Sequence, residues 1–380
     1  MTAPQSTIWS MDRHTQAKHE MLRRYLGAWV PILINYCGRA RIIDGFAGPG
    51  EYENGEIGSP LIALQTLLTH SDKEVQDALH RGSVELICIE QDPKRSQHLQ
   101  KLLEQQKQEL SCPPRLQPRI ITGTFVDEIG KLLTIMERQH ARGNPHPTFV
   151  FIDPFGYSHT PLGVIASILR LPMCEVLITC MSEEINRFLS VDYRTKEQHY
   201  DTLFGTRDWR QITHDEPDAT ERMRRQHDLY RHQLLTAGGA KYVRSFRMRN
   251  QHNATDYFLF FGTNNRKGLT EMKRAMWGVD PTGAFEFSDF SNPYQPLLLT
   301  EPNYADLQRL LNNQFRGQTV PIEEIEEYVL AETPYVSCKQ NALAPMEASS
   351  PPKIRVHLTD PGYKRRKGTF PEDKTFVEFL

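Results

Sequence analysis

The sequence predicts an α/β fold: a doubly wound, mostly parallel sheet with an antiparallel hairpin at one edge, followed by a small C-terminal winged helix-turn-helix domain. Short continuous apolar runs alternate with segments of helical periodicity through the first half of the chain. Such alternation is typical of a buried parallel sheet covered by helices on both faces. The pattern changes after residue 300, so we predict one domain over residues 1–300 and a second over residues 301–380.

Each element of the first domain follows from its local pattern. A segment of helical periodicity comes first, at residues 14–35, and further predicted helices cover 59–68, 93–110, 125–139 and 161–171. The predicted parallel strands are 41–44, 84–90, 119–122, 149–153 and 175–181. Two later strand-like runs, 241–248 and 256–262, are joined by a short polar segment and predict the hairpin. A doubly wound sheet that closes in this way favours a class I methyltransferase fold over a plain dinucleotide-binding fold.

The C-terminal segment has its own pattern. Three short helices are predicted at 304–315, 322–330 and 334–346. A basic strand-like stretch, K-I-R-V-H-L, then leads through the turn T-D-P-G and the run K-R-R-K-G to a last strand near Phe376. Three helices with a two-stranded wing describe a winged helix-turn-helix. The alternative is a small helical appendage that packs on the main domain.

Composition limits the classes of protein to consider. The 380 residues are 39% hydrophobic without a run long enough to span a membrane, and the N-terminus lacks a signal pattern, so we expect a cytoplasmic protein. The six cysteines are scattered without a C-x-x-C pair, which favours reduced core thiols over a metal site. The formal net charge is only −2, so any contact with nucleic acid must come from local basic patches.

A glycine-rich loop follows the first predicted strand, in the stretch I-I-D-G-F-A-G-P-G at residues 42–50. A nicotinamide-dinucleotide fingerprint would place its acid about 20 residues after the glycines, whereas here the acid comes first. That order suits S-adenosylmethionine, because glycines let the backbone approach the cofactor and a carboxylate pairs with its ammonium group. The predicted cofactor-binding residues of the loop are Asp44, Gly45, Phe46, Ala47, Gly48 and Gly50. The alternative is a structural turn with an acid nearby by chance.

A second acid ends the next predicted strand. Glu90 closes V-E-L-I-C-I-E and is placed to bind the ribose hydroxyls of the cofactor, with Gln91 and Asp92 directly behind it. The long gap between the two acids is explained by an extra predicted helix at 59–68.

A third acid ends the fourth predicted strand, in F-V-F-I-D-P-F-G-Y. Ligands of open α/β sheets bind beyond the carboxyl ends of the strands, so Asp153 is expected to face the transferred methyl group. Amino methyltransferases carry D-P-P-Y or N-P-P-Y at this place, where the motif holds an exocyclic amine and its aromatic ring stacks on the base. The predicted catalytic residues are Asp153, Pro154, Phe155 and Tyr157. Alternatively, Asp153 only caps the following turn.

Several of these motifs together resemble the three-Cys-motif partner family, TcmP. They are Y-L (25–26), I-D-G-F-A-G-P-G (43–50), G-S-P (58–60), F-I-D-P-F-G (151–156) and K-G-L-T-E-M-K-R-A-M-W (267–277). The resemblance covers roughly residues 8 to 290 and implies a methyltransferase-like fold. It also implies a partner protein that carries the three-cysteine motif.

A weaker likeness is to a bacterial methyltransferase of 23S rRNA adenine N6, which shares an early His and Lys on a first helix, here His14, Lys18 and His19. His14 and Lys18 lie four residues apart and hence on one helical face, for which we expect a role near the cofactor or the acceptor, against the alternative of a solvated helix face. Many such enzymes bind the adenine amine through an acid after the third strand. This chain has T-G-T there, which leaves the contact to Thr124 or to backbone groups.

Two basic stretches favour a nucleic-acid substrate. Residues 221–249 hold eight Lys or Arg against two acids, and residues 351–368 hold six against one, as expected of phosphate contacts. In the tail, the predicted contacts are Lys364, Arg365, Arg366 and Lys367 of the wing. The leading hypothesis is therefore methylation of an exocyclic amine on a nucleic-acid base. Alternatives are methylation of a small molecule or protein, and a non-catalytic scaffold that binds S-adenosylmethionine or nucleic acid.

Overall fold

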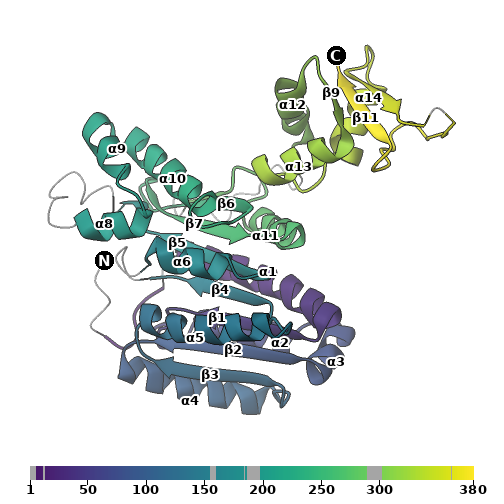
Figure 1. Cartoon of the computed structure of the whole chain (residues 1–380). Helices are drawn as coiled ribbons and strands as arrows, with labels where there is room; N and C mark the ends of the chain where they lie inside the picture. The colour runs from purple at the N-terminus through teal and green to yellow at the C-terminus, as the bar shows by residue number, and fades with distance from the viewer. Residues whose placement is uncertain are drawn as a thin grey trace. The chain divides into compact units, whose positions relative to one another are not determined.

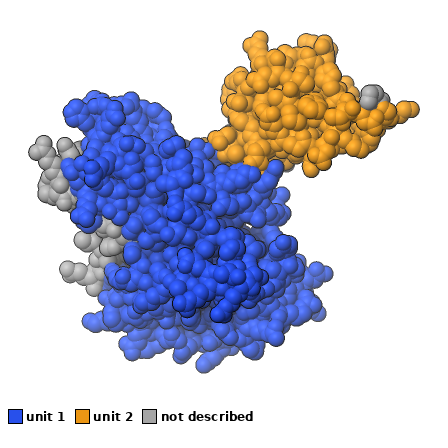
Figure 2. Space-filling view, in the orientation of Figure 1, with its two compact units in different colours: residues 1–275, 286–293 blue, residues 276–285, 294–380 orange. Residues whose placement is uncertain are grey.

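The protein forms two compact units in a computed structural model, which describes residues 6–11, 13–154, 160–183, 185, 197–288, 302–360 and 362–380 (Figure 1). Unit 1 comprises Met1–Ala275 with Glu286–Pro293, and unit 2 comprises Met276–Phe285 with Tyr294–Leu380 (Figure 2). The border between the units therefore differs from the predicted one at residue 300. Residues Met276–Phe285 belong to unit 2 because Trp277 donates a hydrogen bond to the carbonyl of Pro334 and packs on Tyr335.

Unit 1 is built on an eight-stranded sheet with the order β3-β2-β1-β4-β5-β7-β6-β8. Strands β3, β2, β1, β4 and β5 run parallel, whereas β7 lies antiparallel between β5 and β6. The strands are β1 (Arg39–Asp44), β2 (Ser83–Glu90), β3 (Leu116–Thr122), β4 (Thr148–Ile152), β5 (Cys174–Cys180), β6 (Tyr242–Arg249), β7 (Thr255–Thr263) and β8 (Glu286–Ser288). The predicted parallel sheet with an antiparallel hairpin at one edge is confirmed.

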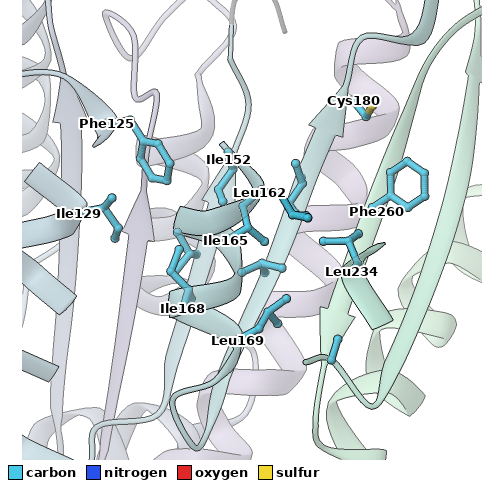
Figure 3. Close-up of a cluster of buried hydrophobic side chains, with 14 of the residues drawn as sticks. Phe125, Ile129, Ile152, Leu162, Ile165, Ile168, Leu169, Cys180, Leu234 and Phe260 are labelled. Atoms are coloured by element: carbon cyan, nitrogen blue, oxygen red, sulfur yellow. The ribbon is translucent and has the colours of Figure 1, made fainter. Parts of the chain in front are cut away.

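Helices cover both faces of this sheet. In chain order they are α1 (Arg13–Cys37), α2 (Ser59–Leu68), α3 (Lys73–Arg81), α4 (Pro93–Glu109), α5 (Phe125–Ala141), α6 (Leu162–Leu169), α8 (Glu197–Phe204), α9 (Trp209–Asp215), α10 (Ala219–Leu235) and α11 (Arg266–Val279). The apolar faces of α5, α6 and α10 supply Ile129, Ile165 and Leu234 to one continuous core with Ile152 and Phe260 of the sheet (Figure 3). On the opposite face, the ring of Tyr25 in α1 lies 5.1 Å from Phe149 and 5.3 Å from Phe261.

Unit 2 contains α12 (Tyr304–Phe315), β9 (Thr319–Pro321), α13 (Ile322–Glu332), a π-helical turn η3 (Lys339–Leu343), α14 (Ala344–Ala348), β10 (Ile354–Leu358) and β11 (Thr375–Phe379). The strands form an antiparallel sheet in the order β10-β11-β9. The third predicted helix, 334–346, is replaced by η3 followed by α14, since Pro345 lies in the first turn of α14. A third strand, β9, joins the two that the sequence predicts.

Candidate cofactor and acceptor pocket

The loop after β1 is held against the carboxyl ends of the neighbouring strands. The amide of Gly45 donates to the carbonyl of Phe151 on β4, and the amide of Ala47 donates to Ile89 on β2. Gly48 and Gly50 have φ angles of +61° and +90°, in the left-handed region that other residues rarely adopt. A Cβ on Gly50 would also lie 2.6 Å from Leu99 Cδ1, whereas one on Gly48 would meet only Trp9, at 3.6 Å. Backbone strain therefore favours glycine at both residues, and at residue 50 a Cβ would in addition have to displace the end of the Leu99 side chain.

Two of the predicted acids lie beside this loop. Asp44 is 2% exposed, and burial raises its pKa to about 7 despite hydrogen bonds from the Ser59 side chain and the Phe46 amide. Glu90 accepts hydrogen bonds from the amides of Gly48, at 2.9 Å, and Asp92, at 2.8 Å. Burial raises the pKa of Glu90 in spite of these two amides. Glu90 thus holds the glycine turn against the end of β2.

Asp153, directly after β4, has a different environment. One carboxylate oxygen accepts a hydrogen bond from the Lys18 ammonium at 2.5 Å, and the other accepts one from the Thr179 hydroxyl at 2.6 Å. Burial by itself would raise the pKa of Asp153, but the Lys18 charge and these hydrogen bonds outweigh it and lower the pKa below its usual value. The Asp153 side chain keeps 24% of its surface exposed. An ionised carboxylate with spare lone pairs therefore remains accessible to a ligand.

One cavity connects these features. Its lining comes from the N-terminal segment, α1, the glycine loop and the ends of β4, β5 and β7. Of the predicted residues it includes Lys18, Phe46, Ala47, Gly48, Gly50, Asp153 and Pro154. The sequence motifs that lie far apart in the chain are thus brought together at the carboxyl edge of the sheet, where open α/β folds bind their ligands.

Other predicted residues lie outside the lining of the cavity: Asp44, Gly45, Glu90, Gln91, Asp92 and Thr124. Asp44, Gly45 and Glu90 nevertheless support the loop from behind. Asp92 caps α4 by accepting the amides of Lys94 and Arg95, and Thr124 caps α5 through the amide of Asp127. These two side chains therefore have structural roles as helix caps. Gln91 is exposed, and Phe155 and Tyr157 lie outside the described residues.

Several lining residues were missed by sequence reasoning. The Trp9 indole packs against the Arg95 guanidinium, 5.0 Å from the ring centroid, and against the edge of Tyr52. The Tyr257 ring lies 5.3 Å from the Lys18 ammonium. Burial and the neighbouring Lys18 charge lower the pKa of His19 to about 3, which leaves its imidazole neutral. Trp9 and Tyr257 come from segments without a motif, so no pattern in the sequence marks them, whereas His19 lies beside Lys18 on the predicted first helix.

The basic stretches are largely engaged in contacts within the protein. On α10, Arg224 pairs with Glu221 and Asp228, and Arg225 pairs with Glu216, an acid just outside the counted stretch. In the predicted wing, Arg365 pairs with Glu347 and donates to the carbonyl of Thr369. Lys364, Arg366 and Lys367 are exposed. The prediction that all four wing cations contact nucleic acid is therefore corrected for Arg365, whose guanidinium is used inside unit 2.

The remaining expectations concern metals and membranes. All six cysteines are free thiols, four of them buried. Within the described residues, no three His, Cys, Asp or Glu side chains are grouped so that they could hold a metal ion. No helix in the same part of the chain is long and apolar enough to cross a membrane.

Comparison with known proteins gives weak similarities. No family model and no curated protein sequence matches this chain. Among solved structures, the methyltransferase domain of bacterial CtHen1 is 11% identical, with a TM-score of 0.32 over 64% of this chain and 100% of that one. Geranyl diphosphate C-methyltransferase from Streptomyces coelicolor A3(2) is 11% identical, with a TM-score of 0.24 over 68% of this chain and 90% of that one.

A protein from Porphyromonas gingivalis W83 that is named as a methyltransferase is 10% identical over 60% of this chain, with a TM-score of 0.27, and the chain spans 37% of its length. At these scores the likenesses add nothing to the fold assignment. That assignment rests on the strand order of the chain itself, a mostly parallel Rossmann-like sheet in which antiparallel β7 lies between β5 and β6.

Proposed function

We propose that the protein is an S-adenosylmethionine-dependent methyltransferase that acts on an exocyclic amine of a nucleic-acid base. The observation that carries the proposal is the placement of Asp153. Its ionised, partly exposed carboxylate lines the same cavity as the left-handed glycine turn of Gly48 and Gly50. The proposed site for the methyl donor, at the glycine turn, and the proposed site for the acceptor amine, at Asp153, thus lie in the same cavity.

The chain around the cavity fits the cofactor. A turn without side chains at Gly48 and Gly50 lets a ligand approach the backbone closely, and the buried carboxyl of Asp44 lies directly behind it. A cationic ammonium would favour the ionised form of Asp44, which burial otherwise disfavours. We assign the ribose contact to Glu90, whose carboxylate oxygens retain acceptor capacity beyond the amides of Gly48 and Asp92.

Asp153 has the properties of a group that holds an amine in place. The cofactor, when bound, supplies an electrophilic methyl group. Because its pKa is lowered, Asp153 is a weak base that stays ionised, so it accepts a hydrogen bond from the amine and stabilises the positive charge that develops on the nitrogen. Lys18 and Thr179 fix the orientation of the carboxylate. The Tyr257 ring provides an aromatic surface in the same cavity.

Unit 2 supports a contact with nucleic acid or with a partner protein. Its element order, α12-β9-α13-η3-α14-β10-β11, and its antiparallel sheet agree with a winged helix-turn-helix, and we propose that assignment. The exposed cations of the wing, Lys364, Arg366 and Lys367, lie between β10 and β11. A shallow hollow beside α13 is lined by three acids of that helix, Glu324, Glu327 and Glu332. Their negative charge would repel phosphate and therefore favours contact with a partner protein. The three-Cys-motif protein is our candidate for this partner.

A second candidate function is a scaffold without turnover, and a third is methylation of a small molecule or protein. The scaffold is favoured by the departure of D-P-F-G from the usual motif, since Phe155 replaces a proline. Calorimetry with S-adenosylmethionine, followed by transfer of a labelled methyl group to bulk RNA and DNA, tests these alternatives. Binding and transfer to nucleic acid are expected. Binding without transfer to any nucleic acid would reject the base methyltransferase, and no binding would reject all cofactor-dependent functions.

A further inference from the structure

A second cavity of unit 1, the amino-edge cavity, has no part in the proposed reaction. Its volume is about 470 Å³, against about 200 Å³ for the cavity that contains Asp153. Its lining includes Pro147 and Met173, which directly precede β4 and β5, and Glu175 near the start of β5. The cavity therefore lies at the amino ends of the parallel strands, opposite the edge at which Asp153 stands.

Much of the lining is apolar. The C-terminal part of α1 supplies Trp29, Ile32, Leu33 and Tyr36. This spacing of three and four residues places all four side chains on one face of the helix. Trp29 is buried, whereas Tyr36 keeps 78% of its surface exposed, so the described residues leave the end of this face uncovered. Met173 has a φ angle of +61°, and strained backbone of this kind clusters at sites that hold ligands.

The polar part of the lining comes from the start of α11, within the motif 267–277 and just before it. Asn265 accepts two helix amides through Oδ1, while its Nδ2 has no hydrogen-bond partner among the described residues. Glu271 receives the Lys267 ammonium, at 2.8 Å, and the Arg274 guanidinium, at 2.7 Å, on the same oxygen, Oε1. Its Oε2 accepts no hydrogen bond in that part of the chain. The lining therefore offers one donor and one acceptor that the protein leaves unused.

Glu175 also lines the amino-edge cavity but serves the fold. It already accepts hydrogen bonds from Tyr25, Trp29 and Thr263. A Cβ on Gly268 would collide with its carboxylate, so glycine at this position lets α11 approach β5. The hydrogen-bonding groups left for a ligand are therefore those of α11.

We propose that the amino-edge cavity is a second ligand site, which takes a neutral aromatic ring that carries a hydrogen-bond donor and an acceptor on one edge, as in a primary carboxamide. The ring matches the apolar face of α1, and the polar edge matches the unused groups of Asn265 and Glu271. Cavities of a few hundred cubic ångströms with apolar walls and a few polar groups are the usual form of small-molecule sites.

The charges around the cavity favour a neutral ligand. Glu271 already balances Lys267 and Arg274, so a cationic ligand would meet two positive charges that share one carboxylate. An anionic ligand would instead approach the open oxygen of Glu271. A neutral amide avoids both repulsions, because its N–H can donate to Glu271 while its carbonyl accepts from Asn265.

Benzamide is the probe, because it joins one aromatic ring to one neutral donor–acceptor edge. Its binding to the full chain, measured by calorimetry and by saturation-transfer NMR, is expected to saturate at one site. Ile32→Trp fills the cavity from a half-buried position on α1 and should abolish this binding. The matched control is Ile135→Trp, at an exposed position of α5 outside the cavity, which should bind as the parent does.

Two further measurements examine the polar edge. Asn265→Asp keeps the oxygen that caps α11 but removes the free donor, so benzamide should bind about fivefold more weakly, the scale of one neutral hydrogen bond. This variant also keeps the test decisive if Ile32→Trp does not fold. Benzoate and benzamidine, which have the same ring with opposite charges, should each bind more weakly to the parent than benzamide does.

The proposal is overturned if the parent does not bind benzamide, if Ile32→Trp or Asn265→Asp binds it as the parent does, or if Ile135→Trp loses it equally. Tighter binding of either charged analogue would also overturn it. Calorimetry with S-adenosylmethionine separates this site from the proposed function. Ile32→Trp should bind the cofactor as the parent does, and benzamide should still bind in its presence, whereas competition between the two would place benzamide in the cavity that contains Asp153 and reject the second site.

Discussion

Two acids of unit 1, the half-buried Asp153 and the buried Glu175, stand at opposite ends of the sheet, and both are held by α1. Asp153 follows β4 at the carboxyl edge and pairs with the Lys18 ammonium. Glu175 lies near the start of β5 and accepts hydrogen bonds from Tyr25, Trp29 and Thr263, all of them neutral donors. The pKa of Asp153 is lowered, whereas burial raises the pKa of Glu175 in spite of its three donors.

The difference separates a reactive site from a structural contact. Asp153 keeps a quarter of its side chain exposed to the cavity of the glycine loop, while Glu175 lines the amino-edge cavity but is only 3% exposed and joins α1 to β5 and β7. Burial of an acid is therefore not by itself a sign of function. The charge of its partner and the exposure of its carboxylate are the informative properties.

The largest expected effect concerns Asp153. Asp153→Asn keeps the shape of the side chain but removes the charge that stabilises the amine, so methyl transfer should fall roughly 10²–10³-fold, the scale of losing one preorganised electrostatic contact. Affinity for S-adenosylmethionine, measured by calorimetry, should stay within a few-fold. Thr179→Val, which removes one orienting donor, should reduce transfer less. Parent-like transfer in Asp153→Asn would remove this residue from the mechanism.

Glu175 should show the reverse behaviour. In Glu175→Gln the amide cannot accept from all three buried donors, so the free energy of unfolding of unit 1 should fall by about 2–4 kcal/mol, as expected when buried donors lose a charged acceptor. Urea denaturation followed by tryptophan fluorescence measures this loss. Cofactor affinity of the folded protein is expected to be unchanged. If Glu175→Gln kept the stability of the parent but failed to bind the cofactor, Glu175 would belong to the functional site and the contrast with Asp153 would be wrong.

The same distinction applies to cations in unit 2. The exposed residues Lys364, Arg366 and Lys367 are expected to contact phosphate, so changing all three to alanine should lower the salt slope for duplex DNA by up to about 2.7, from about 0.9 for each contact. Arg365→Ala should leave the slope unchanged, because its guanidinium is paired with Glu347. Instead it should lower the thermal stability of unit 2. Equal slopes for the triple variant and the parent would assign the wing to protein docking.

Asp44 extends the comparison to an acid whose hydrogen bonds within the described residues, from the Ser59 side chain and the Phe46 amide, come from neutral groups. Its pKa is about 7 in the folded protein against an ordinary value of 3.8, so the folded state binds more protons between these limits. Stability should therefore fall as pH rises from about 4 to 7, by at most about 1.4 kcal/mol per pH unit. Asp44→Asn should flatten this part of the profile and weaken cofactor binding. An identical pH profile in variant and parent would show that Asp44 does not titrate there.

The smallest expected effect tests whether the N-terminal segment takes part in cofactor binding at the cavity that contains Asp153. Trp9 packs over the glycine turn and belongs to the cavity lining. Trp9→Ala should weaken cofactor binding by roughly 0.5–1.5 kcal/mol, the scale of an aromatic contact. Trp277→Phe in unit 2 serves as a control and should bind as the parent does. If both variants bind equally, Trp9 has no part in the site.

The sequence predicts the central strands well, because their burial leaves a simple pattern. Strands β4 and β5 are buried at every position, and their continuous apolar runs are recognisable without other information. The helix α10 was not predicted, since it is mostly polar and buries only four residues in its 17. The three-residue strands β8 and β9 are too short to produce any periodicity.

The site is predictable where local chain geometry imposes a residue type. The acid that ends β1, the glycines that follow it and the acid after β4 can all be recognised from the sequence alone. Thr179 and Tyr257 do not, since they come from other strands and meet Asp153 and Lys18 only in the folded sheet. The charge of α10 was overestimated for a similar reason: Glu216 and Asp218 lie just before the counted stretch, and Glu216 pairs with Arg225.

The contacts of α1 also have a consequence for synthesis of the chain on the ribosome. This first helix packs on α2, which follows soon after it, but some of its side chains have partners far along the sequence: Lys18 and Asp153 are separated by 135 residues and Tyr25 and Glu175 by 150. Phe261 of β7, which packs on Tyr25, is synthesised still later. At about 5–20 residues per second, α1 waits on the order of ten seconds or more for these partners. The part of its apolar face around Tyr25, which packs on Phe149 and Phe261, is exposed during that interval, so nascent unit 1 should depend on a chaperone until β7 emerges.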